Sequence, residues 1–166
     1  QDGASSADLE VLDVVLNDLL RQGVETYPGG GKTLYVSRDS LGENDFYLSD
    51  AQLGSDLQDY RIPDGVAASL RKRNQSVTTI WGDGLASRFA KNGEFEQISD
   101  RNFHPEDYPD CKLIATFWLP GYSANGQYAM VRFAISPTPH GSTGTYLLKR
   151  NGGTWSIEWF EESYYF

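Results

Sequence analysis

The 166-residue sequence has few of the residues that build disulfides and metal centres: one cysteine, Cys111, and two histidines, His104 and His140. A single cysteine excludes an intrachain disulfide and a thiolate metal cluster. Because Cys111 directly precedes an apolar segment, we expect a buried, unreactive thiol. The chain also lacks any run near the ~20 apolar residues that a membrane-spanning helix needs.

Positive charge is the second shortage. Lys and Arg total 14 against 23 Asp and Glu, which gives a formal net charge of −9. Proteins that bind DNA or RNA displace counterions with Lys and Arg, so no nucleic-acid partner is expected. A hydrophobic content of 39% with 13% aromatics argues against disorder, and the length suits one domain with its own core.

The first six residues, Gln1 to Ser6, are polar and precede the first apolar pattern. We predict a disordered leader at residues 1–6 and a single domain over residues 7–166. The leader indicates either a processed export signal or a boundary introduced by cloning. Together with the single cysteine, the first alternative favours a bacterial cell envelope protein that is periplasmic, secreted or lipid-anchored.

The C-terminal third predicts a meander of antiparallel strands. Its segments alternate apolar and polar residues, or are apolar throughout, as half-buried and fully buried strands are. The predicted strands are Lys112–Leu119, Tyr128–Ser136, Thr145–Arg150 and Thr154–Phe160, with Glu161–Phe166 continuing the last. Asn125-Gly126 and Gly152-Gly153 supply the positive φ angles that tight turns require. In the last strand the alternation places Trp155 and Trp159 on one face and Phe160 on the other.

One long helix is predicted from Ala7 to Gln22, where leucines recur at helical spacing. Ser5 and Asp8 have the spacing of a capping box at its start. The apolar stripe of this helix is the expected cover for the sheet, since an uncovered face would forfeit about 1.5–3 kcal/mol for each large apolar side chain. The predicted fold class is therefore α+β, with a long N-terminal helix packed on an antiparallel β-sheet that ends in a C-terminal meander.

The middle of the chain gives weaker signals. A strand is predicted over Thr33–Asp39, and a short helix over Ala51–Leu57 that Gly54 interrupts. Asp64 is the predicted N-cap of a further helix that ends in a basic turn, and a short strand is predicted over Val77–Trp81. The sequence predicts no regular element over residues 85–111.

The candidate ligand-binding residues are His104, Glu106, Asp107 and His140. Imidazole and carboxylate groups are those that a divalent metal or an acid–base pair uses. The spacing matches no closed zinc site, so we predict no metal site, no catalytic residue and no cofactor. The alternative is a small metal-dependent or acid–base hydrolase, which requires folding to bring His140 beside His104.

Two familiar motifs are incomplete. The glycine-rich segment Pro28–Thr33 lacks the first glycine of a phosphate-binding loop, and a strand rather than a helix is predicted after it. Gly121–Asn125 lacks the last glycine of a hydrolase nucleophile elbow and joins two strands. Several aromatic residues suit a sugar- or peptide-binding face if they emerge on an uncovered side of the sheet, although such rings more often form core. They are Trp118, Trp155, Trp159, Tyr164 and Tyr165.

The segment from Gly121 to Val131, followed by Gly144, Tyr146, Lys149, Gly152 and Trp155, resembles a loosely defined family of uncharacterised bacterial domains that are often exported. Their pattern is G-F-S-x-D-G-x-x-A-L-V followed by G-x-Y-x-L-L-K-x-x-G-x-W. The resemblance involves turn and core residues, so it implies an α+β fold and transfers no activity. A similar ending occurs in NTF2-like cone folds, which are the alternative architecture. We expect a non-catalytic exported domain that binds a protein, peptide or glycan through its loops and aromatic residues.

Overall fold

The computed structural model describes residues 4–21, 34–37, 39–42, 45–80, 95–98, 114–136 and 142–164. Its elements are α1 (Ser6–Arg21), β1 (Leu34–Ser37), α2 (Asp45–Leu48), α3 (Asp50–Asp56), α4 (Val66–Arg73), β2 (Phe95–Ile98), β3 (Ile114–Phe117), β4 (Gly121–Tyr122), β5 (Tyr128–Ser136), β6 (Ser142–Asn151) and β7 (Thr154–Tyr164). The strands form one sheet in the order β2-β1-β3-β5-β6-β7, and β4 pairs with β5 beside this path. Pairing is parallel between β1 and β2 and between β1 and β3, and antiparallel elsewhere.

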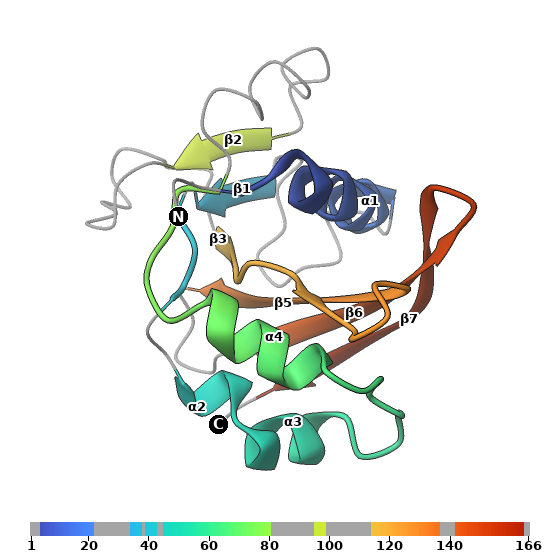
Figure 1. Cartoon of the computed structure of the whole chain (residues 1–166). Coiled ribbons are helices and arrows are strands. Elements are labelled where there is room, and N and C mark those ends of the chain that lie inside the picture. Colours follow the sequence, from blue (N-terminus) through green and yellow to red (C-terminus); the bar gives the residue numbers. More distant parts are fainter. Residues whose placement is uncertain are drawn as a thin grey trace.

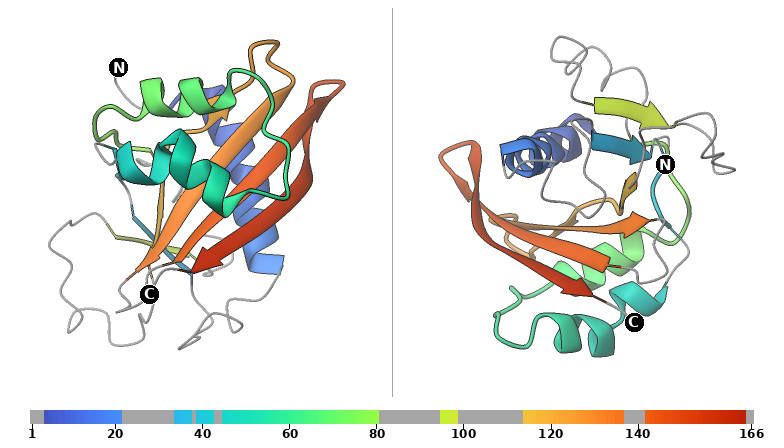
Figure 2. Two further views of the ribbon diagram at one scale, coloured as in Figure 1. Left: turned by 90° about the horizontal axis from the view of Figure 1, so that it is seen from below. Right: turned by 180° about the vertical axis from the view of Figure 1, so that it is seen from behind.

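The fold is α+β, as predicted, with α1 packed on the antiparallel part of the sheet. Figure 1 shows α1 on one side of β5, β6 and β7 and the helices α2, α3 and α4 on the other, and Figure 2 shows the same layers from below and behind. Antiparallel pairing of β3, β5, β6 and β7 confirms the predicted meander. No described helix has both the length and the apolar content to cross a membrane.

Two hydrophobic clusters fill the spaces on the two sides of the sheet. The cluster under α1 includes Leu12, Leu16, Val131, Phe133, Tyr146 and Leu148. The cluster under α3 and α4 includes Leu53, Leu57, Leu70, Met130 and Leu147. Neighbouring residues of β5 and of β6 thus enter opposite clusters, which confirms the predicted alternation in these strands.

The start of α1 has the predicted capping box. The Ser5 hydroxyl accepts a hydrogen bond from the backbone N–H of Asp8 at 3.1 Å, and the Asp8 carboxylate accepts one from the N–H of Ser5 at 3.0 Å. These bonds satisfy two of the backbone donors that a helix N-terminus leaves unpaired. The helix begins at Ser6 and ends at Arg21, each one residue before the predicted limit.

The helices of the middle segment differ from prediction in two details. Helix α3 continues through Gly54, so the predicted interruption is wrong, while Ser49 caps the helix by accepting the N–H of Gln52 at 3.2 Å. The N-cap of α4 is Gly65, with φ of 87°, and not Asp64. A Cβ at Gly65 would meet the backbone nitrogen of Ala124 at 2.9 Å, which is a second reason for glycine there.

Two strand predictions in this region are also wrong. Within residues 77–80 the structure has only an isolated bridge between Asp39 and Thr79, and Trp81 lies outside the described residues. Conversely, β2 forms at Phe95–Ile98, inside the segment for which the sequence predicts no regular element. Four residues with long-range parallel pairing leave little local signal, because β2 depends on β1 for its hydrogen bonds.

A β-bulge interrupts the hairpin of β6 and β7. Leu147 pairs with Trp159, whereas the next residue, Leu148, pairs with Ile157. Glu158 is therefore the extra residue of β7 and has no partner across the ladder. Such a bulge changes the face to which the following side chains point.

The bulge overturns the predicted alternation of the last strand. Trp155 packs against the cluster under α1, but Trp159 packs against the cluster under α3 and α4. Phe160 in turn packs on the α1 side. The prediction that Trp155 and Trp159 share a face is therefore wrong, and the side chain of Trp159 lies on the side that carries the pocket described below.

Both predicted glycine turns are present. The hairpin of β6 and β7 closes through Gly152 and Gly153, whose φ angles of 57° and 91° match a two-residue turn with both residues in the left-handed region. Gly126, in the turn before β5, has φ of 71°.

Candidate functional site

The four candidate residues from the sequence, His104, Glu106, Asp107 and His140, lie outside the described residues, as do Cys111 and the segment Pro28–Thr33. Whether folding brings the two histidines together stays a prediction. Within the part of the chain that the structure describes, no group of three or more His, Cys, Asp or Glu side chains is placed to hold a metal ion.

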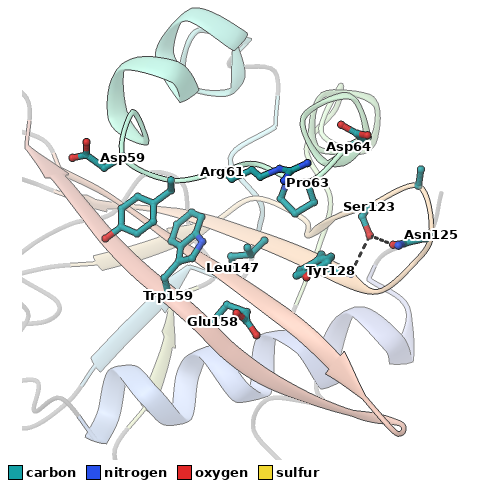
Figure 3. A pocket seen from close by; sticks show the side chains of 12 residues that line it. Asp59, Arg61, Pro63, Asp64, Ser123, Asn125, Tyr128, Leu147, Glu158 and Trp159 are labelled. Carbon is teal, nitrogen blue, oxygen red and sulfur yellow. Dashed lines mark hydrogen bonds between the residues drawn. The ribbon is translucent and has the colours of Figure 1, made fainter.

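A pocket of about 750 Å³ opens on the side of the sheet covered by α3 and α4 (Figure 3). Three parts of the chain enclose it: the connection between α3 and α4, the turn between β4 and β5, and residues of β5, β6 and β7. The lining residues are Asp59, Tyr60, Arg61, Pro63, Asp64, Ser123, Ala124, Asn125, Tyr128, Leu147, Glu158 and Trp159.

The floor of the pocket consists of Tyr128, Leu147 and Trp159, one from each of three neighbouring strands. The indole of Trp159 stacks on the ring of Tyr60, with 4.3 Å between ring centroids and 26° between planes. The Tyr60 hydroxyl donates to Glu161 at 3.1 Å, and this hydrogen bond raises the pKa of Tyr60. The stacked pair joins β7 to the α3–α4 connection. It therefore fixes this connection, which forms one wall of the pocket, relative to the floor.

Hydrogen bonds within the turn before β5 fix a second wall. The Ser123 hydroxyl donates to the side-chain oxygen of Asn125 at 2.8 Å and accepts the backbone N–H of Tyr128 at 3.0 Å (Figure 3). The N–H of Ala124 donates to the carbonyl of Asp64 at 3.0 Å, which ties the turn to the start of α4. Hydrogen bonds within the chain therefore hold this wall in its shape, and no ligand is needed for it to form.

Four charged side chains surround the aromatic floor: Asp59, Arg61, Asp64 and Glu158. All four are exposed, and none of them forms an ion pair with another residue in the described part of the chain. Glu158 is the extra residue of the bulge, and the bulge lets two consecutive residues, Glu158 and Trp159, line the same pocket. Unpaired charges around an aromatic surface are available to a ligand.

A buried polar cluster holds α4 near the pocket. Arg73, at the end of α4, binds both carboxylate oxygens of Asp8 at 2.8 and 2.7 Å, and the Tyr122 hydroxyl donates to the same carboxylate at 2.6 Å. Arg73 also donates to the carbonyl of Pro120 at 2.6 Å. The cluster joins α1, α4 and β4, elements that are far apart in the sequence.

The titration behaviour of this cluster follows from its contacts. Burial disfavours the Asp8 anion, but the hydrogen bonds from Arg73, Tyr122 and Ser5 outweigh burial and hold the pKa of this carboxyl below its usual value. The hydrogen bond to Asp8 raises the pKa of Arg73. Burial, followed by the bond to Asp8, raises the pKa of the Tyr122 phenol. The cluster is thus a fixed ion pair with a neutral phenol at neutral pH.

A second buried ion pair fixes α3. Arg132 of β5 is fully buried and donates to Asp56 at 2.8 Å, at the end of α3, and to the hydroxyl of Thr145 at 2.9 Å. Because α3 and α4 flank the connection that lines the pocket, the two ion pairs set the position of that wall. Both pairs have partners from within the chain, so we assign them a structural role.

Comparisons of the chain with protein-family models, with curated proteins and with solved structures give no match. The resemblance to bacterial exported domains stays a prediction, and the pocket geometry is the basis for a functional proposal.

Of the aromatic residues predicted to line a binding face, Trp159 lines the pocket. Trp118 is fully buried, Trp155 packs toward α1, and Tyr164 and Tyr165 have no described side chain. No sequence pattern indicates Tyr60 and Arg61, which lie in a connection without periodicity. One available signal was the adjacent pair Trp159-Phe160, since two large rings in succession break the alternation of the strand and indicate a bulge.

Proposed function

We propose that the chain is a non-catalytic binding domain that holds part of a protein, peptide or glycan in the pocket over Trp159. The observation that carries this proposal is a hollow with an aromatic floor and with charged side chains at its rim that form no ion pair in the described part of the chain. Ligand sites are typically concave, span about 300–1,000 Å³ and combine apolar walls with a few polar groups. The volume of about 750 Å³ fits this range.

The described lining residues favour binding over catalysis. They include no histidine or cysteine, and the one serine, Ser123, is engaged in the hydrogen bonds of its turn. A serine nucleophile needs a base within hydrogen-bond distance, and the bonded neighbours of Ser123 are an amide and a backbone N–H. Stacking on Trp159 with hydrogen bonds to the rim accounts for the arrangement without a reaction.

The test is an NMR titration of the isotopically labelled chain with two sets of ligands: short peptides, and neutral oligosaccharides such as chitotetraose and cello-oligosaccharides. We expect shifts at the Trp159 indole and at residues of the surrounding wall. The Trp159→Ala variant should bind about tenfold more weakly, because aromatic contacts contribute about 0.5–1.5 kcal/mol beyond buried area.

Trp155→Ala is the matched control, since it removes the same side chain from the same strand on the opposite face. It should retain the affinity of the unchanged chain. Equal loss in both variants, or shifts confined to the α1 side of the sheet, would contradict the proposal. Urea unfolding of each variant separates loss of binding from loss of fold.

A further inference from the structure

We infer that the occupant of the pocket is a positively charged group, the side chain of a lysine or arginine in a segment of a partner protein. This inference rests on the proposed binding function and specifies the chemistry of the ligand. Three features of the pocket carry it: its charge balance, the faces of its aromatic rings and the open position of its carboxylates.

The charge balance of the lining is negative. Asp59, Asp64 and Glu158 contribute three carboxylates against the single guanidinium of Arg61, which leaves a formal charge of −2. These side chains come from two parts of the rim: Asp59, Arg61 and Asp64 lie in the α3–α4 connection, and Glu158 lies at the bulge of β7. A cation over the floor is therefore attracted by carboxylates from both of these parts.

Two charged residues that contact lining residues do not alter this balance. Glu161 accepts the hydrogen bond of Tyr60, and the Lys149 ammonium lies over the ring of Tyr128. One flanking carboxylate and one flanking cation offset each other, so the surplus of two carboxylates remains. The surrounding chain, with a formal charge of −9, adds a long-range attraction for a basic partner.

The floor already binds an ammonium group of the chain itself. The Lys149 Nζ lies 5.9 Å from the centroid of Tyr128, within the distance of about 6 Å at which cations interact with aromatic faces. Trp159, which is the strongest acceptor type for such contacts, offers the face that is not stacked on Tyr60. An incoming ammonium or guanidinium therefore finds the same type of contact on the ring of Trp159, which lies across β6 from Tyr128.

The exposure of the carboxylates favours a side chain that arrives on a partner. Asp59, Asp64 and Glu158 are all open to solvent at the rim, so each can bind a cation without losing an internal partner. A neutral glycan would gain from the aromatic floor but nothing from the surplus charge. An acidic segment would be repelled, because like charges at a contact oppose binding.

Charge variants test the inference with matched probes: N-acetylated Gly-Lys-Gly, Gly-Arg-Gly, Gly-Gln-Gly and Gly-Glu-Gly amides, and chitotetraose. Binding is followed by NMR of the full chain. We expect the lysine and arginine peptides to bind more tightly than the glutamine peptide, by about threefold to fivefold, and the glutamate peptide most weakly.

Glu158→Gln should weaken binding of the lysine peptide by about twofold to fivefold, and Arg61→Gln should strengthen it by a similar factor. These opposite signs distinguish charge recognition from general damage to the pocket. Glu10→Gln is the control, since Glu10 is an exposed carboxylate on α1, on the other side of the sheet. It should leave the affinity unchanged.

The outcomes separate the two proposals. Equal affinities for the four peptides, or equal effects of both charge variants, would overturn the inference. If chitotetraose shifts Trp159 and neither charge variant alters its affinity, the binding function stands and the cationic occupant is wrong. If none of the probes shifts the lining residues, both proposals fail.

Discussion

The Asp8→Asn substitution tests whether the buried carboxylate at the start of α1 fastens this helix to the rest of the fold. Asparagine keeps the shape of the side chain and removes the charge that Arg73 and Tyr122 bind. The amide nitrogen of asparagine replaces one of the two carboxylate oxygens, so a donor of Arg73 faces N–H groups in place of an acceptor. The guanidinium therefore loses its only described counter-ion and half of its carboxylate hydrogen bonds.

The size of the effect follows from the exposure of the two partners. Removing one member of a buried ion pair costs about 3–5 kcal/mol. The Asp8 side chain is 1% exposed, whereas that of Arg73 is 18% exposed, so the orphaned guanidinium regains some water. We therefore expect the lower end of the range, about 3 kcal/mol, out of a total stability that is typically about 5–15 kcal/mol.

Urea unfolding at pH 7, followed by tryptophan fluorescence, measures this loss. With an m-value of about 2 kcal/mol/M, the midpoint should fall by about 1.5 M. Glu10→Gln, on the exposed side of the same helix, should change the free energy of unfolding by less than about 0.5 kcal/mol. A loss below about 1 kcal/mol for Asp8→Asn, at an unchanged m-value, would refute the argument.

The same pair of proteins gives a pH dependence with a definite sign. The folded-state pKa of Asp8 lies below its ordinary value of 3.8, so its stabilising effect is complete above that pH and is lost as the pH falls through the lower folded-state pKa. The difference in stability between the unchanged chain and Asp8→Asn should therefore be constant from pH 7 to pH 5 and shrink below about pH 4. A difference that persists undiminished in acid would contradict the assigned pKa direction.

Two further substitutions have matched controls in the chain. Asp56→Asn should cost about 3–5 kcal/mol in urea unfolding, because it leaves the fully buried arginine of β5 without its carboxylate, whereas Asp50→Asn, in an ion pair whose aspartate is 80% exposed, should cost about 0–1 kcal/mol. Equal costs would contradict the role of burial. Gly144→Ala places a Cβ 2.2 Å from the ring of Phe133 and should lower stability by about 1–3 kcal/mol, whereas Gly54→Ala, with open space around it inside α3, should raise it by about 0.5–1 kcal/mol. A thermal midpoint that rises for both variants would show that the core yields to the added methyl group.

The parts of the fold that the sequence predicts correctly have local signals. Helix α1 follows from leucine spacing and from the reciprocal pair Ser5 and Asp8, which are three residues apart. The turn at Gly152-Gly153 follows from the backbone freedom of two glycines. In each case neighbouring residues contain all the necessary information, so no knowledge of tertiary contacts is required.

The pocket depends on contacts that no local pattern reveals. Trp159 and Tyr60 stack although they are 99 positions apart in the numbering, and Asp64 contacts the turn at Ala124 through a backbone hydrogen bond. The bulge at Glu158 is a property of the register between two strands, and strict alternation assigns Trp159 to the wrong face. The sequence thus predicts the antiparallel meander and the helix α1 that covers one of its faces. The binding surface instead arises from the α3–α4 connection on the other face and from the bulge at Glu158.

The long-range bonds of α1 have a consequence for synthesis of the chain. Asp8 accepts a hydrogen bond from the hydroxyl of Tyr122, 114 residues later, and Asp18 accepts one from the hydroxyl of Tyr146, 128 residues later. Helix α1 is therefore synthesised well before the two tyrosines that its carboxylates bind, and until then Asp8 and Asp18 lack these hydrogen bonds. Such distant pairings slow folding, because the chain must close large loops before the contacts form. The N-terminal half thus cannot complete its contacts before the C-terminal half is synthesised. Truncation before residue 146 should yield a chain that cannot bury α1.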